Sequence, residues 1–404
     1  MTARQNMGDS TNKNLIYYIS LIGFFAIFST TISKNPVLPL YARSLGADAA
    51  LIGLIAALSP FAGVVFSFPI GVASDRLGRK RLLLFSGFIF MAAPPLYLLV
   101  GGNPWLLIPI RFFHGAATAI LGPVVSAILA EKYSATKGEK IGIYSSSTLI
   151  GRTIAPLLGG SVIAHYALMG LTNYQTVYLI AAAAAVPVFL LILLYKEENG
   201  ALQGALRLDA FRESLRAFLS DKRLTATALV DLSTYFSYGA METYLPLLLQ
   251  LKGYSASDTG IIFAVQIFTI AASKPLLGKA ADRVDKRKQI ALGLIALGLV
   301  MAAVPYAQDM TQYLLISVVA GLAISTSTIA TTTYTADVAK QKELGASMGA
   351  LSAIMDIGQT AGPLLTGIVI TTASYSAGFM ASTALAAAIT GVFLYASYAR
   401  PERV

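Results

Sequence analysis

The chain has 404 residues, of which 56% are hydrophobic and only 12% are charged, about half the charged share of a soluble protein. A water-soluble fold of this size is therefore excluded. The sequence has a net charge of +10, no cysteine, and only two histidines, His114 and His165, so disulfides are excluded and neither a metal site nor a cofactor is expected.

Apolar runs recur along the chain at lengths that suit transmembrane helices. About 20 helical residues cross a ~30 Å hydrocarbon layer, and lipid offers no partner for exposed backbone groups, so the spans must be helices. The first run is too long for a cleaved signal peptide. The sequence predicts twelve spans, at 15–42, 48–74, 82–101, 105–130, 141–164, 175–195, 224–250, 257–278, 289–306, 312–336, 344–371 and 376–398.

Basic residues are unevenly distributed among the predicted loops. Of the 30 Lys and Arg residues, 24 fall in the termini and in alternate loops around 75–81, 131–140, 196–223, 279–288 and 337–343. The other loops hold only Arg43 and Lys252. The positive-inside rule therefore predicts a multi-pass protein of the cell membrane with both termini in the cytoplasm. This basic surplus indicates topology and contact with anionic lipids, and nucleic acid is not an expected partner.

The two halves of the chain match each other at an offset of 207 residues. The matches fall on glycine, proline and charged positions, which chance similarity among apolar helices would not produce. Examples are Gly53 with Gly260, Pro156 with Pro363, and Gly160 with Gly367. Six spans per half make the repeat parallel. We predict an all-α membrane protein of two six-helix bundles, residues 1–195 and 224–404, joined by a cytoplasmic linker, 196–223, that contains an amphipathic helix.

A motif of glycine and charged residues lies at the cytoplasmic end of the second predicted span. Gly71-Val-Ala-Ser-Asp75-Arg76-Leu-Gly78-Arg79-Lys80-Arg81 resembles the G-x-x-x-D-R-x-G-R-R signature of the major facilitator superfamily. The corresponding loop of the second half keeps the Asp-Arg pair. The resemblance implies a latch at the cytoplasmic face, formed by Gly71, Asp75, Arg76, Gly78, Arg79, Asp282 and Arg283.

Two more elements narrow this resemblance. Arg111-Phe-Phe-His-Gly115 looks like the R-x-x-x-G element of the family. The segment Gly151-Arg-Thr-Ile-Ala155-Pro156-Leu-Leu-Gly159-Gly160 is similar to the G-x-x-x-G-P-x-x-G-G signature of its twelve-span antiporters, with Ala155 in place of a glycine. The resemblance covers nearly the whole chain. It implies a secondary carrier like the drug:proton antiporters, and not an enzyme.

Seven ionisable residues lie inside the predicted spans. Each costs about 2.5 to 3.5 kcal/mol at the centre of a helix in lipid, so these side chains should face a water-filled cavity or one another. Neighbouring polar residues extend them into stripes along several spans. The residues expected to line a substrate cavity are Lys34, Asn35, Arg111, His114, Arg152, Tyr235, Tyr238, Lys274 and Gln359.

Three acids in the spans are candidates for coupling transport to protons. Glu242 is the first choice, with Asp356 and Asp231 as alternatives. The 207-residue offset matches Glu242 with Asn35, next to Lys34, so we expect the acid and the lysine to form an ion pair across an outer gate. Alternatively, each acid pairs permanently with a basic residue and only holds helices together.

The leading interpretation is a proton-coupled, alternating-access exporter of small amphipathic or hydrophobic compounds, working as a monomer in the bilayer. The second is an ion-coupled importer or exchanger of a polar solute such as a sugar, an organic anion or a metal chelate, held by the basic residues. A membrane enzyme or scaffold is least favoured, because no nucleophile and base occur at a usable spacing. No G-x-x-x-x-G-K-[ST] loop is present, so ATP is not the expected energy source.

Overall fold

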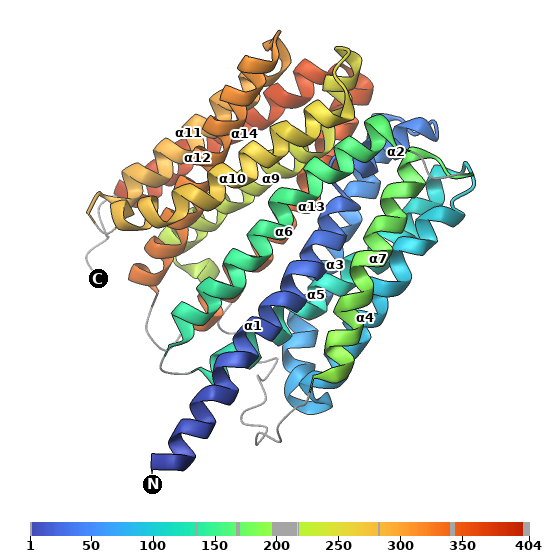
Figure 1. The fold of residues 1–404 in the computed structure, drawn as a ribbon. Helices are drawn as coiled ribbons and strands as arrows, with labels where there is room; N and C mark the ends of the chain where they lie inside the picture. Colours follow the sequence, from blue (N-terminus) through green and yellow to red (C-terminus); the bar gives the residue numbers. More distant parts are fainter. Residues whose placement is uncertain are drawn as a thin grey trace.

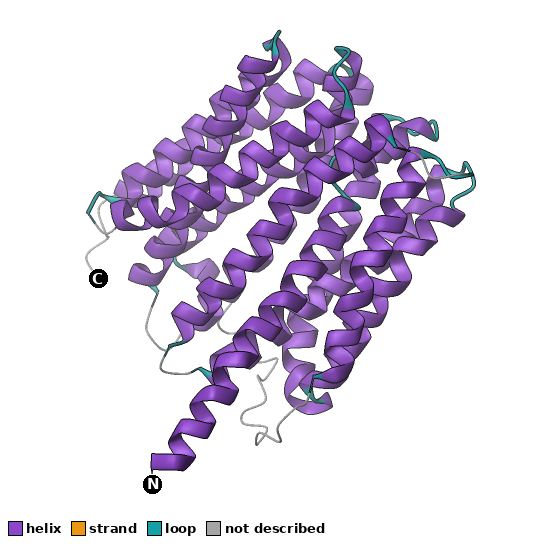
Figure 2. Ribbon diagram, viewed as in Figure 1, coloured by secondary structure: helices purple, strands orange, loops and turns teal. Residues whose placement is uncertain are grey.

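The computed structural model describes residues 2–133, 136–166, 170–195, 216, 218–281, 283–339 and 344–398. These residues form helices and short turns, without a strand (Figures 1 and 2). The long helices are α1 (Thr2–Ile32), α3 (Ala49–Leu77), α4 (Arg79–Leu96), α5 (Leu107–Lys132), α6 (Lys137–His165), α7 (Asn173–Leu194), α9 (Lys222–Leu251), α10 (Ala256–Ala281), α11 (Lys286–Ala303), α12 (Met310–Val338), α13 (Leu344–Thr372) and α14 (Tyr375–Tyr398). The shorter ones are α2 (Val37–Ser44) and the 3-10 turns η1 (Tyr97–Leu99), η2 (Pro104–Leu106) and η3 (Val304–Tyr306).

Eleven helical segments of the described chain are long and apolar enough to cross a membrane, with α1 and α2 forming one of them. The helix missing from this set is α9, which has 30 residues but a polar sequence. It packs against α12, α13 and α14, and most of its residues are buried. Protein therefore surrounds its polar side chains. The all-helical membrane fold is confirmed, whereas the count of twelve spans stays a prediction.

The first predicted span, 15–42, is not one continuous helix. Helix α1 ends at Ile32 and α2 begins at Val37. Proline lacks a backbone N–H and disfavours helical geometry in the residue before it, so Pro36 interrupts the helix. Lys34 and Asn35 lie in the break, where their side chains can turn into the interior.

Aspartates begin four of the helices. The side chains of Asp48, Asp221, Asp285 and Asp309 accept hydrogen bonds from backbone N–H groups in the first turns of α3, α9, α11 and α12, respectively. Such caps satisfy N–H groups that have no partner within the helix. They mark where the chain turns at the two ends of the bundle.

The two halves share a hydrophobic core at one end of the bundle, which we call the closed end. Val37 and Ile52 of the first half pack there with Tyr244, Phe263 and Ile370 of the second. At the other end, which we call the open end, the described buried clusters each stay within one half. In Figure 1 the closed end is at the top, near α2, and the N-terminus lies at the opposite end. The halves thus meet at one end and pack separately at the other.

Two close helix crossings seal the closed end, α3 with α13 and α6 with α10. A Cβ atom on Gly53 would lie 2.3 Å from the carbonyl oxygen of Pro363, and one on Gly160 would lie 2.3 Å from that of Ala256. Only glycine permits backbones to approach so closely. Gly260 and Gly367, which match these two glycines at the 207-residue offset, make similar contacts. The internal repeat therefore relates the two crossings.

The α3–α13 crossing also carries polar contacts. The hydroxyl oxygen of Tyr244, on α9, lies 3.0 Å from the carbonyl oxygen of Ala49 and 2.6 Å from that of Pro363. The backbone N–H of Ala50 donates to Thr371 Oγ1 over 2.9 Å. These bonds join three helices from both halves.

The motif at the end of α3 is only partly described. Gly71, Asp75 and Arg76 lie within α3, but their side chains are outside the described atoms. Gly78 joins α3 to α4 with φ of 84°, a conformation that glycine adopts without strain. Arg79 forms an ion pair with Glu131 of α5, in the same half.

In the corresponding region of the second half, the role predicted for Asp282 and Arg283 stays a prediction. Asp282 lies outside the described residues, and Arg283 is exposed in the turn before α11. Arg287 joins helices here: its Nη2 lies 3.0 Å from Asp285, its Nη1 donates to the carbonyl oxygen of Ser397, and its guanidinium covers the Tyr398 ring. Of the linker predicted to contain an amphipathic helix, residues 196–215 and 217 lie outside the described residues.

Candidate functional site

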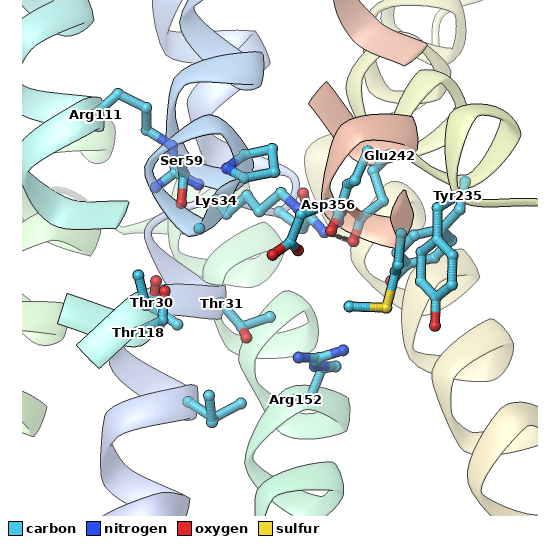
Figure 3. Close-up of a pocket in the computed structure, with 18 of the residues that line it drawn as sticks. Thr30, Thr31, Lys34, Ser59, Arg111, Thr118, Arg152, Tyr235, Glu242 and Asp356 are labelled. Carbon is cyan, nitrogen blue, oxygen red and sulfur yellow. Dashed lines mark hydrogen bonds and ion pairs between the residues drawn. The ribbon is translucent and has the colours of Figure 1, made fainter. Parts of the chain in front are cut away.

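A cavity of about 360 Å³ lies between the two halves. Residues of α1, α3, α5, α6, α9 and α13, and of the break after α1, form its wall (Figure 3). The wall is mostly polar and carries five ionisable side chains. The lining residues are Ile27, Thr30, Thr31, Lys34, Asn35, Ser59, Pro60, Gly63, Ser67, Arg111, Thr118, Ala119, Arg152, Tyr235, Tyr238, Glu242, Met355, Asp356 and Gln359.

Glu242 is held by donors from both halves of the chain. Lys34 Nζ lies 2.6 Å from its Oε2, and Asn35 Nδ2 lies 2.6 Å from its Oε1. Gln359 Nε2, on α13, is 3.4 Å from Oε2. The Glu242 residue is only 5% exposed, so the pair operates in a medium where charge attraction is strong. The break after α1 and the middle of α9 are thereby tied together.

Asp356, on α13, lies against α3 of the other half. A Cβ atom on Gly63 would be 2.8 Å from Asp356 Oδ2, so the carboxylate occupies the space left by the missing side chain. Within the described residues its carboxylate has no ion-pair partner. Figure 3 shows it between Lys34 and Arg152, facing the cavity. It is the cavity carboxylate free to take a proton or a ligand.

Two arginines of the first half face the cavity without an acid. Arg111, on α5, is 1% exposed, and its Nε and Nη1 atoms have no hydrogen-bond partner. Arg152, on α6, is exposed to the space of the cavity. No described acid forms an ion pair with either guanidinium. The cavity therefore presents more donors than its own acceptors satisfy.

Three of the residues predicted for the site do not line the cavity. Asp231 is buried on α9 and accepts a 2.7 Å hydrogen bond from Thr331 of α12, within the second half. His114 is fully buried, 3.3 Å from the hydroxyl of Tyr97. Lys274 is exposed on α10. The pattern of polar residues along one helix does not show which of them face the cavity, because this depends on how the neighbouring helices pack against it.

The contribution of α3 to the cavity was missed. Ser59, Gly63 and Ser67 follow one another at intervals of four residues and form one small, polar face of the helix. This spacing is visible in the sequence, but these residues carry no charge. The described residues contain no cluster of three His, Asp or Glu that could hold a metal ion.

The sequence matches the family model described as Major Facilitator Superfamily over residues 19–306 and 252–404. The chain belongs to this superfamily. The match confirms the predicted family and assigns a membrane transporter of small molecules in place of an enzyme or a scaffold. The cavity between the halves is thus the candidate substrate site of a transporter.

Named relatives cover most of the chain. It is 24% identical over 338 residues to an uncharacterised MFS-type transporter of Methanocaldococcus jannaschii, covering 83% of this chain and 86% of the relative. It is 26% identical over 377 residues to the multidrug resistance protein MdtG of Enterobacter lignolyticus, covering 90% and 87%.

Solved structures share the fold. A bacterial homologue of the human lysosomal transporter Spinster, inward-facing and unoccupied, aligns with a TM-score of 0.79 at 16% identity over 96% of this chain and 97% of that chain. A mutant form of the nucleoside transporter NupG aligns with a TM-score of 0.80 at 14% identity, covering 95% and 99%.

Proposed function

We propose that this transporter is a proton-coupled exporter of small amphipathic or hydrophobic compounds, working by alternating access from the cell membrane. The relatives named multidrug resistance proteins support export of such compounds. The predicted cytoplasmic loops, which hold most of the basic residues, fall at the open end. The open end then faces the cytoplasm together with both termini, and the cavity is ready to receive an intracellular substrate.

The ion pair between Lys34 and Glu242 carries the coupling part of the proposal. It joins the two halves beside the closed end. Its strength therefore affects the equilibrium between the conformation that is open to the cytoplasm and the one that is open to the outside. A proton on Glu242 removes the negative charge and weakens this link. A ligand can shift a conformational equilibrium only by binding one state better than the other, and a proton does so here.

Asp356 is the second proton-coupling candidate, because it faces the cavity without a basic partner. A proton entering down a potential of about 100 mV supplies about 2.3 kcal/mol. This supports roughly a fifty-fold concentration ratio of a neutral substrate. Either carboxylate would bring the proton to the wall that also holds the substrate.

A second candidate function is ion-coupled import or exchange of a polar solute. The serine, threonine and arginine side chains in the cavity wall favour it. The direction of transport distinguishes the two functions. It is measured in proteoliposomes of defined orientation, with an imposed pH gradient and a panel of dyes and polar solutes. An exporter should show efflux driven by inward proton flow.

Glu242→Gln tests the coupling role. Glutamine keeps the size and the hydrogen bond to Asn35 but cannot carry the charge, so gradient-driven accumulation should be abolished while substrate binding is largely retained. Asp231→Asn removes a buried acid of the same helix outside the cavity and should leave accumulation intact, whereas loss of accumulation in this variant alone would assign coupling to Asp231. A Glu242→Gln protein that still concentrates substrate against a gradient would assign coupling elsewhere.

A further inference from the structure

Arg111 is a buried cation with unused hydrogen-bonding capacity. Its side chain lines the cavity, only 1% of the residue is exposed, and Nε and Nη1 have no partner. An unpaired charge away from water is costly, and such groups are normally paired or bound to a ligand. The guanidinium also contacts the neutral hydroxyl of Tyr97, which does not balance its charge, so Arg111 is available to an anion that enters the cavity.

The residues around Arg111 form a shaped niche. Gly115 lies one turn after Arg111 on α5, and a Cβ atom there would come within 2.6 Å of Ser59 Cα. The glycine thus allows α3 to approach α5, which brings Ser59 next to the guanidinium (Figure 3). The Nε–H and Nη1–H donors of Arg111 and the hydroxyl of Ser59 therefore lie in the same region of the cavity wall.

The acids of the cavity do not fill this niche. Glu242 is occupied by Lys34 and Asn35, and Asp356 lies against Gly63. With ordinary ionisation, the wall holds three basic side chains and two acidic ones, so one positive charge is uncompensated. A substrate bearing one negative charge balances it.

We propose that the transported compound carries an anionic group, a carboxylate or a phosphate, which binds Arg111 and Ser59. This rests on the proposed transport role of the cavity and narrows its substrates to amphipathic anions. Arginine suits either group because its N–H fork matches two oxygen atoms at once. The apolar part of the compound lies against the aromatic and thioether side chains of Tyr235, Tyr238 and Met355.

The test compares three probes with the same ring and different charges: 1-naphthoate, 1-naphthamide and 1-naphthylmethylammonium. Equilibrium binding is measured with the purified full-length protein in nanodiscs of zwitterionic lipid. Naphthoate should bind at least about ten-fold more tightly than the other two. Arg111→Gln should remove this preference and leave naphthamide binding unchanged, while Arg111→Lys, which keeps the charge without the fork, should be intermediate.

Lys279→Gln is the control for charge alone, because it removes an exposed lysine of α10 outside the cavity and should leave binding unchanged. Ser59→Ala, which retains Arg111, provides a milder test if Arg111→Gln does not fold, and should weaken naphthoate binding selectively. Nanodiscs that contain phosphatidylglycerol distinguish the source of the anion. Competition with naphthoate indicates a lipid headgroup at this site, and no competition indicates a soluble compound.

The proposal is overturned if naphthoate does not bind saturably, if naphthamide binds equally well, or if Arg111→Gln weakens all three probes alike. The assay contains no ion gradient. Failure of anion selectivity therefore leaves proton-driven export standing, and loss of driven export leaves the anion site standing.

Discussion

At the scale of single residues, the Lys34–Glu242 pair is a buried ion pair that joins the two halves. Glu242 has little access to water, and it relies on Lys34 and Asn35 to compensate the cost of burying its charge. A buried pair of this kind contributes little net stability relative to apolar residues of similar size. Loss of one partner alone is expensive, because the other charge remains buried.

This asymmetry predicts the outcome of a double-mutant cycle. Lys34→Met should lower the free energy of unfolding by about 3 kcal/mol, because it leaves Glu242 charged and unpaired. The double variant Lys34→Met/Glu242→Gln should recover most of this loss. Unfolding of the purified protein in detergent, followed by circular dichroism, measures both. Equal instability of the single and double variants would mean that the pair is not an energetic unit.

At the scale of helices, Asp285 connects the start of α11 to the end of α14 through Arg287. Its hydrogen bond from the Arg287 side chain lowers the pKa of the Asp285 carboxyl from its ordinary value of 3.8. A folded-state pKa below the unfolded one means that the charged carboxylate stabilises the fold at higher pH. The stabilisation is lost as pH falls through the folded-state pKa.

Asp285→Asn should therefore lower the melting temperature at neutral pH, and the difference from the unsubstituted protein should disappear in acid below the folded-state pKa of Asp285. Asparagine can still cap α11, so this variant removes the charge alone. Asp285→Ala should cost about 1 kcal/mol more, because the cap is also lost. Melting curves of the three proteins across pH measure this. A difference that persists unchanged in acid would show that the charge is not responsible.

At the scale of the whole molecule, the repeat-related glycine crossings hold the two halves together at the closed end. Gly160→Ala places a methyl group 2.3 Å from the Ala256 carbonyl oxygen, in a backbone contact that cannot yield without separating α6 from α10. The equilibrium should shift toward a state in which the closed end opens and the open end closes. Gly391→Ala is the control, because nothing lies within 4 Å of its added methyl group.

Spin-label distances measure this shift, and the absence of native cysteine makes the labelling specific. Pairs introduced at the exposed residues Tyr166 and Tyr306, and at Glu139 and Val284, report on the closed and open ends. Gly160→Ala should lengthen the first distance and shorten the second. If both distances lengthen, the variant has only loosened the bundle.

Much of the fold could be predicted because lipid constrains the chain strongly. Hydropathy located most of the long helices. The internal repeat brought distant residues together: Asn35 and Glu242, 207 positions apart, form a hydrogen bond. Residues related by a two-fold repeat touch only near its axis, so this contact lies at the centre of the molecule. The family motifs likewise predicted the superfamily correctly.

The rest depended on how each helix is rotated against its neighbours. His114 and Lys274 were predicted to line the cavity but are not in its wall, whereas uncharged Ser59 and Gly63 form part of it. The break at Pro36 was not predicted, because apolar residues on both sides of the proline made the segment look like one continuous span. Charge in the sequence identifies the residues that must be kept away from lipid, but only the packing of the helices shows which neighbouring residues surround them.

The single proton of the Tyr244 hydroxyl is shared between two carbonyl groups. Ala49 belongs to the first half, while Pro363 belongs to the same half as Tyr244. When the halves separate, the hydroxyl can rotate fully toward Pro363, and no orphaned donor is left behind. The contact between the two halves can therefore break here without leaving the Tyr244 hydroxyl unpaired. Such a contact can form and break repeatedly during transport.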